Sequence, residues 1–292
     1  MGGTVNLRRG CTYTLTDAAP PNDDNGLPVI KSKVTINGCG DTITRAATAA
    51  KFRFFEIDGP NANLILNALT LSNGHASTSL GNGRGGAIRL NGTGPALTLN
   101  NASLKTNTAD VFGGAVDNDN GAFSVNRSTL RNNKASSGGA VFVSPFGGSG
   151  TATLDRSRII GNHASVLGGG IAAAVGTKAT LTSTQVTGND VTGANAQGGG
   201  IFNTVGTVRL TDSPVTGNTV NGTNSRGGGI FNTGSGTVAL TRSPVTRSRA
   251  LGTGANGGGI FNASGSVTRI ASRVTGNRPN NCGSPSTVPG CS

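Results

Sequence analysis

The residues that could do chemistry recur at one position of a sequence repeat. Glu56, Arg89 and Asp117 follow the same apolar residue of three successive repeats, and Glu56 is the only glutamate among the 292 residues. Later repeats carry apolar residues at this position: Phe142, Ala172, Phe202, Phe231 and Phe261. An acid–base–acid series within an otherwise apolar column predicts a localised functional region.

Basic residues also occur at two further positions of the repeat, in the same part of the chain. Both histidines, His75 and His163, fall at one position together with Lys134. Lys105 and Arg131 fall at another, where later repeats carry Thr187, Thr216, Thr246 and Thr275. If equivalent positions stack, these side chains become neighbours, and the loop before the Gly-Gly strand would fold over them as the edge of a cleft.

This set suits elimination chemistry on a uronate sugar. A cation must neutralise the carboxylate of the sugar, a base must remove the neighbouring proton, and an acid must protonate the leaving oxygen. Arg89 or Arg131 would neutralise the carboxylate, and His163 or Lys134 would be the base if neighbouring cations lower its pKa. Asp117 would assist.

A hydrolase would use two carboxylates instead. Asp117 and Asp119 would project to one side of a strand about 7 Å apart, and Glu56 and Asp117 would lie roughly 10 Å apart, which suits an inverting mechanism. In the elimination reaction Tyr13 is the alternative to Asp117 as the assisting group, but it lies in the first repeat. The residues expected to bind substrate are Asn118, Asp119, Asn120, Lys105, Arg156, Arg158 and Phe142.

Each group also has a structural interpretation. The Glu56–Arg89–Asp117 series could be an exposed charge ladder, and the histidines could be surface turn residues. The phenylalanine row could pack under a loop or offer a platform for sugar rings. The threonine row most simply reflects the strand preference of β-branched residues. Binding to ice through ordered water is a remote alternative.

These positions are defined by an internal repeat. A Gly-Gly-Ala/Gly-Ile/Val sequence recurs at spacings of 28, 25, 30, 30, 29 and 30 residues. It occupies residues 85–88, 113–116, 138–141, 168–171, 198–201, 227–230 and 257–260. Each copy is followed by a T-V-x-L-T-x-S-x-V-T-G-N segment. Short apolar runs between Gly and Asn turns are typical of a stacked solenoid.

We therefore predict an all-β chain that forms one right-handed parallel β-helix of about ten coils, with three strands per coil. Residues 1–76 are irregular N-terminal coils, 77–278 the regular repeats and 279–292 a C-terminal tail. A ladder of buried amides should satisfy the backbone at one turn. Its members are Asn107, Asn133, Asn162, Asn189, Asn218 and Asn277.

Composition limits the partners. The formal charge is +12, which favours an acidic polysaccharide or another polyanion. Nucleic acid is disfavoured, because no aromatic platform is interleaved with the basic residues. No apolar stretch is long enough to cross a membrane, so we expect no membrane partner.

The four cysteines lie in two pairs at opposite ends of the chain. Local pairing predicts Cys11–Cys39 and Cys282–Cys291 bridges, although four cysteines allow three connectivities. Disulfides favour an oxidising, extracellular setting. No zinc-type spacing is present. We expect no cofactor, with calcium at the 117–120 acidic run as an open alternative.

The repeat sequences GGGIFN and LT-S-VTGN, the early runs TYTL and VTINGCGDTI, and NRPNNC in the tail carry a resemblance. Together they resemble the secreted right-handed β-helix repeat proteins of bacteria over nearly the whole chain. Their fold resembles that of pectate lyases, polygalacturonases, alginate lyases and chondroitin-type lyases. The same fold also occurs in adhesins. A small basic chain of this kind is similar to secreted bacterial hyaluronidases.

The resemblance thus implies a secreted enzyme that cleaves a uronate-containing polysaccharide, most simply hyaluronan, by β-elimination. The alternative is a non-catalytic surface or adhesin-type rod that binds anionic glycans.

Overall fold

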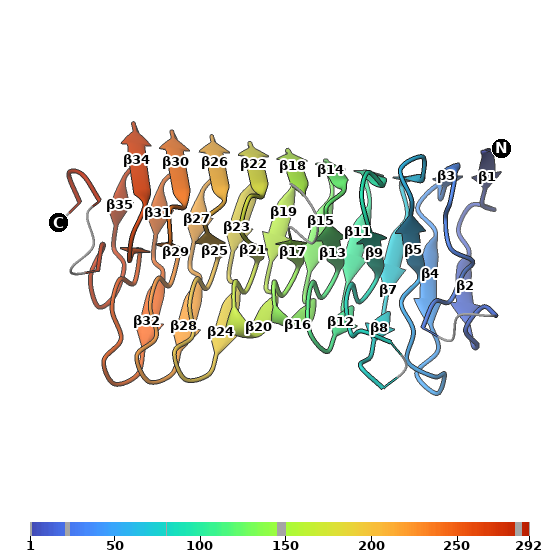
Figure 1. Ribbon diagram of the computed structural model, residues 1–292, viewed down its shortest axis with the longest axis horizontal. Helices are drawn as coiled ribbons and strands as arrows, with labels where there is room; N and C mark the ends of the chain where they lie inside the picture. The colour runs from blue at the N-terminus through green and yellow to red at the C-terminus, as the bar shows by residue number, and fades with distance from the viewer. Residues whose placement is uncertain (1, 21–23, 80, 145–149, 284–287, 292) are drawn as a thin grey trace.

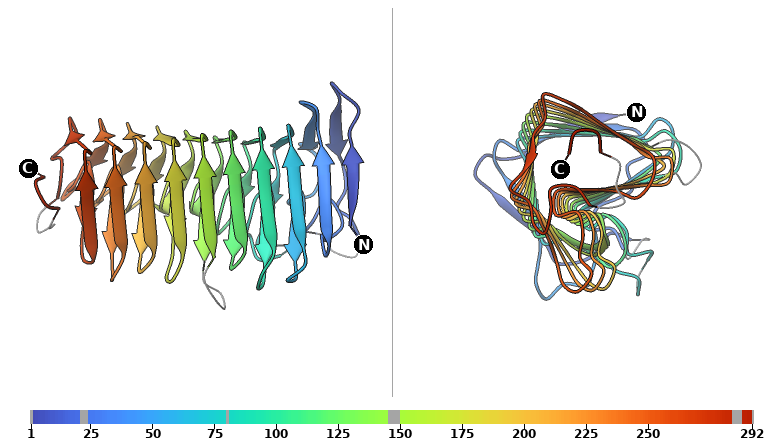
Figure 2. Two further views of the ribbon diagram at one scale, coloured as in Figure 1. Left: turned by 90° about the horizontal axis from the view of Figure 1, so that it is seen from above. Right: turned by 90° about the vertical axis from the view of Figure 1, so that its left-hand side faces the viewer.

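The computed structural model describes residues 2–20, 24–79, 81–144, 150–283 and 288–291. Within them the protein is an all-β parallel solenoid of about nine turns, close to the ten coils predicted. The coils follow one another in sequence order along a single rod (Figure 1). Seen end-on, they superpose around a common interior (Figure 2). The predicted stacking of repeats is therefore confirmed.

Sheet 1 runs the full length of the rod and has ten parallel strands. Its strands are β1 (Gly3–Asn6), β3 (Lys33–Asn37), β6 (Asn63–Asn67), β10 (Ala96–Asn100), β14 (Ala122–Asn126), β18 (Thr151–Asp155), β22 (Lys178–Thr182), β26 (Thr207–Thr211), β30 (Thr237–Thr241) and β34 (Ser266–Ile270).

Sheet 2 also has ten strands. They are β2 (Thr12–Leu15), β4 (Thr42–Arg45), β7 (Thr70–Ser72), β11 (Ser103–Lys105), β15 (Thr129–Arg131), β19 (Arg158–Ile160), β23 (Gln185–Thr187), β27 (Val215–Thr216), β31 (Val245–Thr246) and β35 (Val274–Thr275).

Most coils carry a fourth, short strand in addition to the three predicted. These strands form the seven-stranded sheet 3, made of β8 (His75–Ala76), β12 (Thr108–Ala109), β16 (Lys134–Ser137), β20 (His163–Leu167), β24 (Asp190–Thr192), β28 (Thr219–Asn221) and β32 (Arg249–Leu251). The eight-stranded sheet 4 holds β5 (Phe55–Asp58), β9 (Ile88–Asn91), β13 (Val116–Asp119), β17 (Val141–Ser144), β21 (Ile171–Ala173), β25 (Ile201–Thr204), β29 (Ile230–Thr233) and β33 (Ile260–Asn262).

The alternation of apolar and polar residues fixes which side chains enter the core. Leu97, Leu99 and Leu104 are buried in one coil, while Thr98 between the two leucines of β10 is only partly buried. Equivalent residues pair in register with those of neighbouring coils, as Leu99 does with Val125. A single coil cannot bury its own apolar side, so each coil depends on the next for stability.

The repeated glycines meet a steric requirement of this stacking. Gly113 has a φ of 62°, in the left-handed region that favours glycine. A Cβ on Gly114 would collide with the carbonyl oxygen of Gly139 in the next coil. The glycine pair thus allows the chain to turn into sheet 4 while touching its neighbour.

The predicted amide ladder is confirmed. Asn107 Nδ2 donates to Asn133 Oδ1 at 3.0 Å, and Asn133 Nδ2 donates to Asn162 Oδ1 at 2.9 Å. The same oxygens accept the backbone N–H groups of the preceding asparagines. Each buried amide therefore satisfies polar backbone atoms of an adjacent coil.

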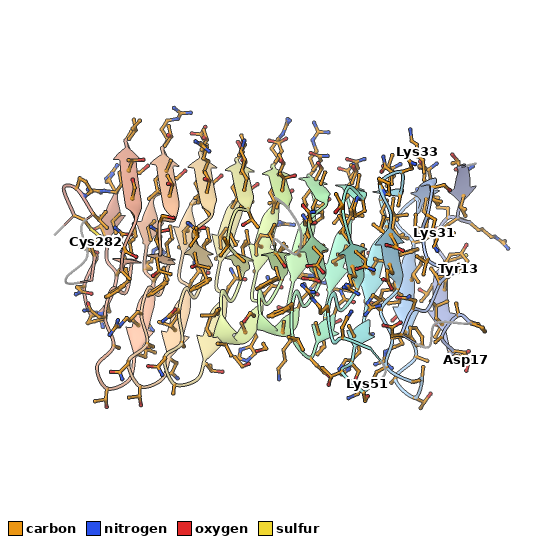
Figure 3. The ribbon with its side chains drawn as sticks, viewed as in Figure 1. Tyr13, Asp17, Lys31, Lys33, Lys51 and Cys282 are labelled. Atoms are coloured by element: carbon orange, nitrogen blue, oxygen red, sulfur yellow. A yellow bond between two sulfur atoms is a disulfide. The ribbon has the colours of Figure 1, made fainter. Side chains whose placement is uncertain are left out.

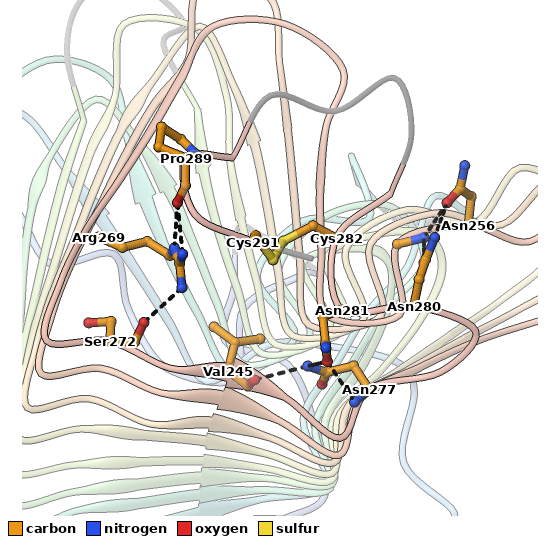
Figure 4. Close-up of a disulfide and its surroundings, with 11 residues drawn as sticks. Val245, Asn256, Arg269, Ser272, Asn277, Asn280, Asn281, Cys282, Pro289 and Cys291 are labelled. Atoms are coloured by element: carbon orange, nitrogen blue, oxygen red, sulfur yellow. Dashed lines mark hydrogen bonds between the residues drawn. A yellow bond between two sulfur atoms is a disulfide. The ribbon is translucent and has the colours of Figure 1, made fainter.

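The C-terminal end of the rod is covered by the tail. The predicted Cys282–Cys291 disulfide is formed, and Val288 is buried against the core. The guanidinium of Arg269 donates to the carbonyl of Pro289 in the same region (Figure 4). The predicted Cys11–Cys39 bridge is wrong, because both thiols are free in the structure.

Candidate functional site

The structure stacks the three charged residues as predicted. Glu56 pairs with Arg89, Arg89 with Asp117, and Asp117 with Phe142 on adjacent strands of sheet 4. An exposed charge ladder was one interpretation of this series, yet Asp117 is fully buried. The charged end of this column is therefore an interior network, and only its edges reach the surface.

Arg84, which the sequence interpretation missed, is the centre of that network. Its Nη1 and Nη2 contact the two carboxylate oxygens of Asp119 at 2.8 Å each. Its Nε lies 3.0 Å from Asp117 Oδ2. Ser144 Oγ adds a hydrogen bond to Asp119 at 2.9 Å. The bidentate geometry of Arg84 and Asp119 is the strong form of an arginine–carboxylate pair.

Arg89 connects Asp119 to the N-terminal half of the network. Its Nη2 is 3.3 Å from Asp119 Oδ2, and its Nη1 is 3.7 Å from Glu56 Oε1. Glu56 Oε2 lies 3.3 Å from Arg53, a fully buried arginine that also contacts Asp24 at 3.0 Å. In the sequence Arg53 stands out as the one charged residue within the aromatic run 52–55 (FRFF), which indicates a buried arginine.

Burial determines the protonation of Asp117. Desolvation raises its pKa to about 7 even though Arg84 lies beside it, since the Asp119 charge adds to the burial effect. Its Oδ1 has no hydrogen-bond partner among the described residues. Asp117 can therefore exchange a proton near neutral pH.

The predicted acidic loop does not offer a free set of oxygen ligands. Asp117 and Asp119 face the arginines, and Asn118 is turned inward, where its amide donates to the carbonyl of Gly121 at 3.0 Å. Asn120 is partly buried at the turn. Among the described residues no three His, Cys, Asp or Glu side chains gather as a metal site.

The aromatic half of the column is packed under a returning segment of chain. Phe142 retains 9% of its exposure and Phe231 only 3%. Phe112 stacks on Phe142 with centroids 4.2 Å apart, and Arg226 lies over Phe261. The covering residues form their own ladder of bridges: Arg84, Phe112, Ser137, Leu167, Gln197, Arg226 and Asn256. This favours the structural interpretation of the phenylalanine row.

Both histidines lie in the predicted column of sheet 3 and pair with acids. His163 Nδ1 is 2.7 Å from Asp190 Oδ2, and its Nε2 is 3.5 Å from the hydroxyl of Thr192. Lys134 is the register partner of His163 in the preceding coil. No contact is found between His163 or Lys134 and Asp117 among the described residues.

The other histidine forms a similar pair. His75 Nε2 lies 3.0 Å from Asp110 Oδ1. Burial would raise the pKa of Asp110, but hydrogen bonds from His75, the Thr78 N–H and the Ser77 hydroxyl lower it to about 2. A hollow of about 570 Å³ lies beside this pair, and Asp110 and Lys134 contribute to its wall.

A basic patch covers the outer side of sheet 2, the turn that precedes it and the beginning of sheet 3. It consists of Lys105, Arg127, Arg131, Lys134, Arg156 and Arg158. All but Lys105 are exposed. Arg131 pairs in register with Lys105, and Arg158 pairs with Thr129 on the strand of Arg131. Three adjacent coils therefore bring these six cations onto one surface.

The arginines of this patch border a hollow. Arg127, Arg156 and Arg158, together with Thr129, Ser128 and neighbouring polar side chains, line a cavity of about 320 Å³. Asp155 contacts Arg156 at 2.7 Å. For the other five cations, no carboxylate of the described residues lies within ion-pair distance. The patch therefore keeps an uncompensated positive charge next to hydroxyl groups.

Arg127 was also missed by the sequence interpretation. It occupies the left-handed turn position before sheet 2, with a φ of 48°, as do Arg156 and Arg242. The signal was the recurring R-S pair at residues 127–128, 156–157 and 242–243.

The candidate residues thus form two separate groups. Glu56, Arg89, Asp117 and Asp119 form the interior network on sheet 4, whereas Arg131, Lys134, His163, Lys105, Arg156 and Arg158 lie on sheets 2 and 3 or the turn between sheets 1 and 2.

Comparisons of this chain with protein-family models, with curated proteins and with solved structures found no match. The described part of the chain contains no helix long and apolar enough to cross a membrane.

Proposed function

We propose that this protein binds an acidic, uronate-containing polysaccharide on its basic patch, outside the cell. The observation that carries the proposal is the hollow lined by Arg127, Arg156 and Arg158. Guanidinium groups are suited to bidentate recognition of carboxylates. The exposed Ser183 and Gln185 in the lining of the hollow can form hydrogen bonds with sugar hydroxyls.

The dimensions of the patch fit an extended chain. Arg127 and Lys134 lie before and after strand β15 of the same coil, so the patch extends along the coil beyond the strand at both ends. Lys105 and Arg158 lie one coil to either side of Arg131, and neighbouring coils are about 4.8 Å apart. A polymer with repeated carboxylates would contact several cations at once, whereas a single uronate would contact few.

Export is supported by the Cys282–Cys291 disulfide, because disulfides persist in oxidising environments. The net charge of +12 supports a polyanionic partner. Hyaluronan is the first polymer to test, since the sequence resemblance implies it.

Cleavage of the bound polymer by β-elimination is the second candidate. It is favoured by the His163–Asp190 pair beside Lys134 at the margin of the patch. A carboxylate on Nδ1 orients the imidazole and leaves Nε2 available as a base, while Lys134 or Arg131 would neutralise the uronate carboxylate.

The test mixes the protein with hyaluronan, chondroitin, alginate and polygalacturonate. Retention of the protein on at least one immobilised polymer is expected, and Arg131→Glu with Arg158→Glu should abolish it. Lys178→Glu with Arg209→Glu, at two exposed sites on sheet 1, is the control with the same change of charge. Equal retention of the patch variant and the control would contradict the proposal.

Products are followed in the same mixtures. New reducing ends with absorbance of unsaturated uronate would support elimination, and His163→Ala should then remove both signals while binding persists. Binding without either signal would support the non-catalytic rod.

A further inference from the structure

The N-terminal end of the rod exposes the side chains of its first coil. Val5 and Tyr13 pair in register with the core residues Ile36 and Ile43 of the second coil, and Ile30 pairs with the buried Ile57. Strands β1 and β2 are the terminal strands of sheets 1 and 2. Val5 retains 47% of its exposure. The first coil therefore presents an apolar interior at the end of the rod.

This interior forms a defined cavity of about 420 Å³. Its floor comes from the second coil, with Ile36, Ile43 and Phe55, and its walls are the first coil and residues 27–32. Small-molecule pockets have volumes of roughly 300–1,000 Å³. The walls are aliphatic, so an occupant would gain affinity chiefly from buried hydrocarbon.

Polar groups occur at only a few points of this cavity. Lys31 and Tyr13 line it, and the Tyr13 hydroxyl accepts a hydrogen bond from the Arg8 N–H at 2.9 Å. Arg8 and Arg9 are exposed next to the lining residue Leu7. Figure 3 shows Tyr13 and Lys31 at the N-terminal end of the rod. The charges around the cavity are mainly positive, which disfavours a second copy of this basic end.

We propose that this cavity binds an amphiphile with one apolar chain and one anionic head group, such as a fatty acid. The chain lies among the aliphatic side chains, and the carboxylate pairs with the Lys31 ammonium, where the hydroxyl of Tyr13 is also available. The site is separate from the basic patch and does not depend on polysaccharide binding.

The chain carries its own reporter of this site. Tyr13 is the only tyrosine and the sequence has no tryptophan, so tyrosine fluorescence excited near 280 nm arises from the cavity wall. Dodecanoate and its dibrominated form are titrated below their micellar concentrations. Saturable quenching by the brominated form, competed by dodecanoate, is expected.

Two variants separate the head group from the chain. Lys31→Ala should weaken dodecanoate binding several-fold and leave dodecanol binding unchanged. Lys33→Ala removes the same charge two residues away on the exposed outer side of β3, and it should have little effect on either ligand. Shortening the chain to decanoate should weaken binding about tenfold, since each buried CH₂ contributes about 0.8 kcal/mol.

Three results would overturn the proposal. They are quenching that does not saturate, equal effects of Lys31→Ala and Lys33→Ala, and a protein that is dimeric in solution with Tyr13 inaccessible to the brominated ligand. The last result would assign the apolar end to a second copy of this chain.

Discussion

Two groups of charged residues occur in the same part of the rod, yet they have opposite environments. At sheet 4, Arg89 of strand β9 and Arg84 of the segment before it are nearly buried and paired with Asp117 and Asp119. On sheet 2, Arg131 and its neighbours are exposed and largely without carboxylate partners among the described residues. The position of a charge within the coil decides whether it holds the fold together or remains available to a ligand.

The physical basis of the difference is desolvation. A buried ion pair is expensive to form and still more expensive to break, because removing one partner leaves the other charge uncompensated. An exposed cation costs little to place and little to remove. Substitutions in the two groups should therefore affect different properties.

The largest expected effect is on stability. Arg84→Ala leaves Asp119 without its bidentate partner and Asp117 without its nearest cation. The free energy of unfolding should fall by about 3–5 kcal/mol. Urea unfolding followed by circular dichroism measures this loss. Arg131→Ala, in the exposed patch, should change stability by no more than about 0.5 kcal/mol, and similar losses in both variants would remove the distinction between the two groups.

A second effect concerns pH. The pKa of Asp117 is raised to about 7 in the folded protein, above an unfolded value of about 3.9. Its contribution to stability is therefore fully present below about pH 4 and is lost as pH rises through 7. The loss amounts to up to about 4 kcal/mol.

Asp117→Asn isolates that contribution, because the amide cannot titrate. The melting temperature of the wild type should fall between pH 5 and 8 relative to the variant, measured in matched buffers. Parallel curves for the two proteins would show that Asp117 is already ionised in the folded state at pH 5.

The sequence predicted which residues stack but not which stacked residues are covered. Spacing alone placed Glu56, Arg89 and Asp117 on adjacent strands, and it placed Lys105 beside Arg131. Both follow from the rule that equivalent positions of a parallel solenoid lie above one another.

Whether a stacked residue is covered depends on the segments that fold over the sheets, and these segments show no strong repeat pattern. Arg84 and Phe112 sit in the segment that returns from sheet 3 to sheet 4, and its folding over the column cannot be read from alternation. The two-residue strand β8 (His75–Ala76) is likewise too short to show a period. The burial of Asp117 and the central position of Arg84 in the ion-pair network therefore do not follow from the spacing of the repeats.

The central claim is that the exposed cations, and not the buried ones, bind a polyanion. Its most direct test is the affinity for hyaluronan as a function of salt concentration. Displacement of counterions predicts that the logarithm of the association constant falls linearly with the logarithm of salt concentration. Arg131→Gln with Arg158→Gln should lower both the affinity and the slope, while Arg209→Gln leaves the slope unchanged. A slope that is the same in all three proteins would contradict the account.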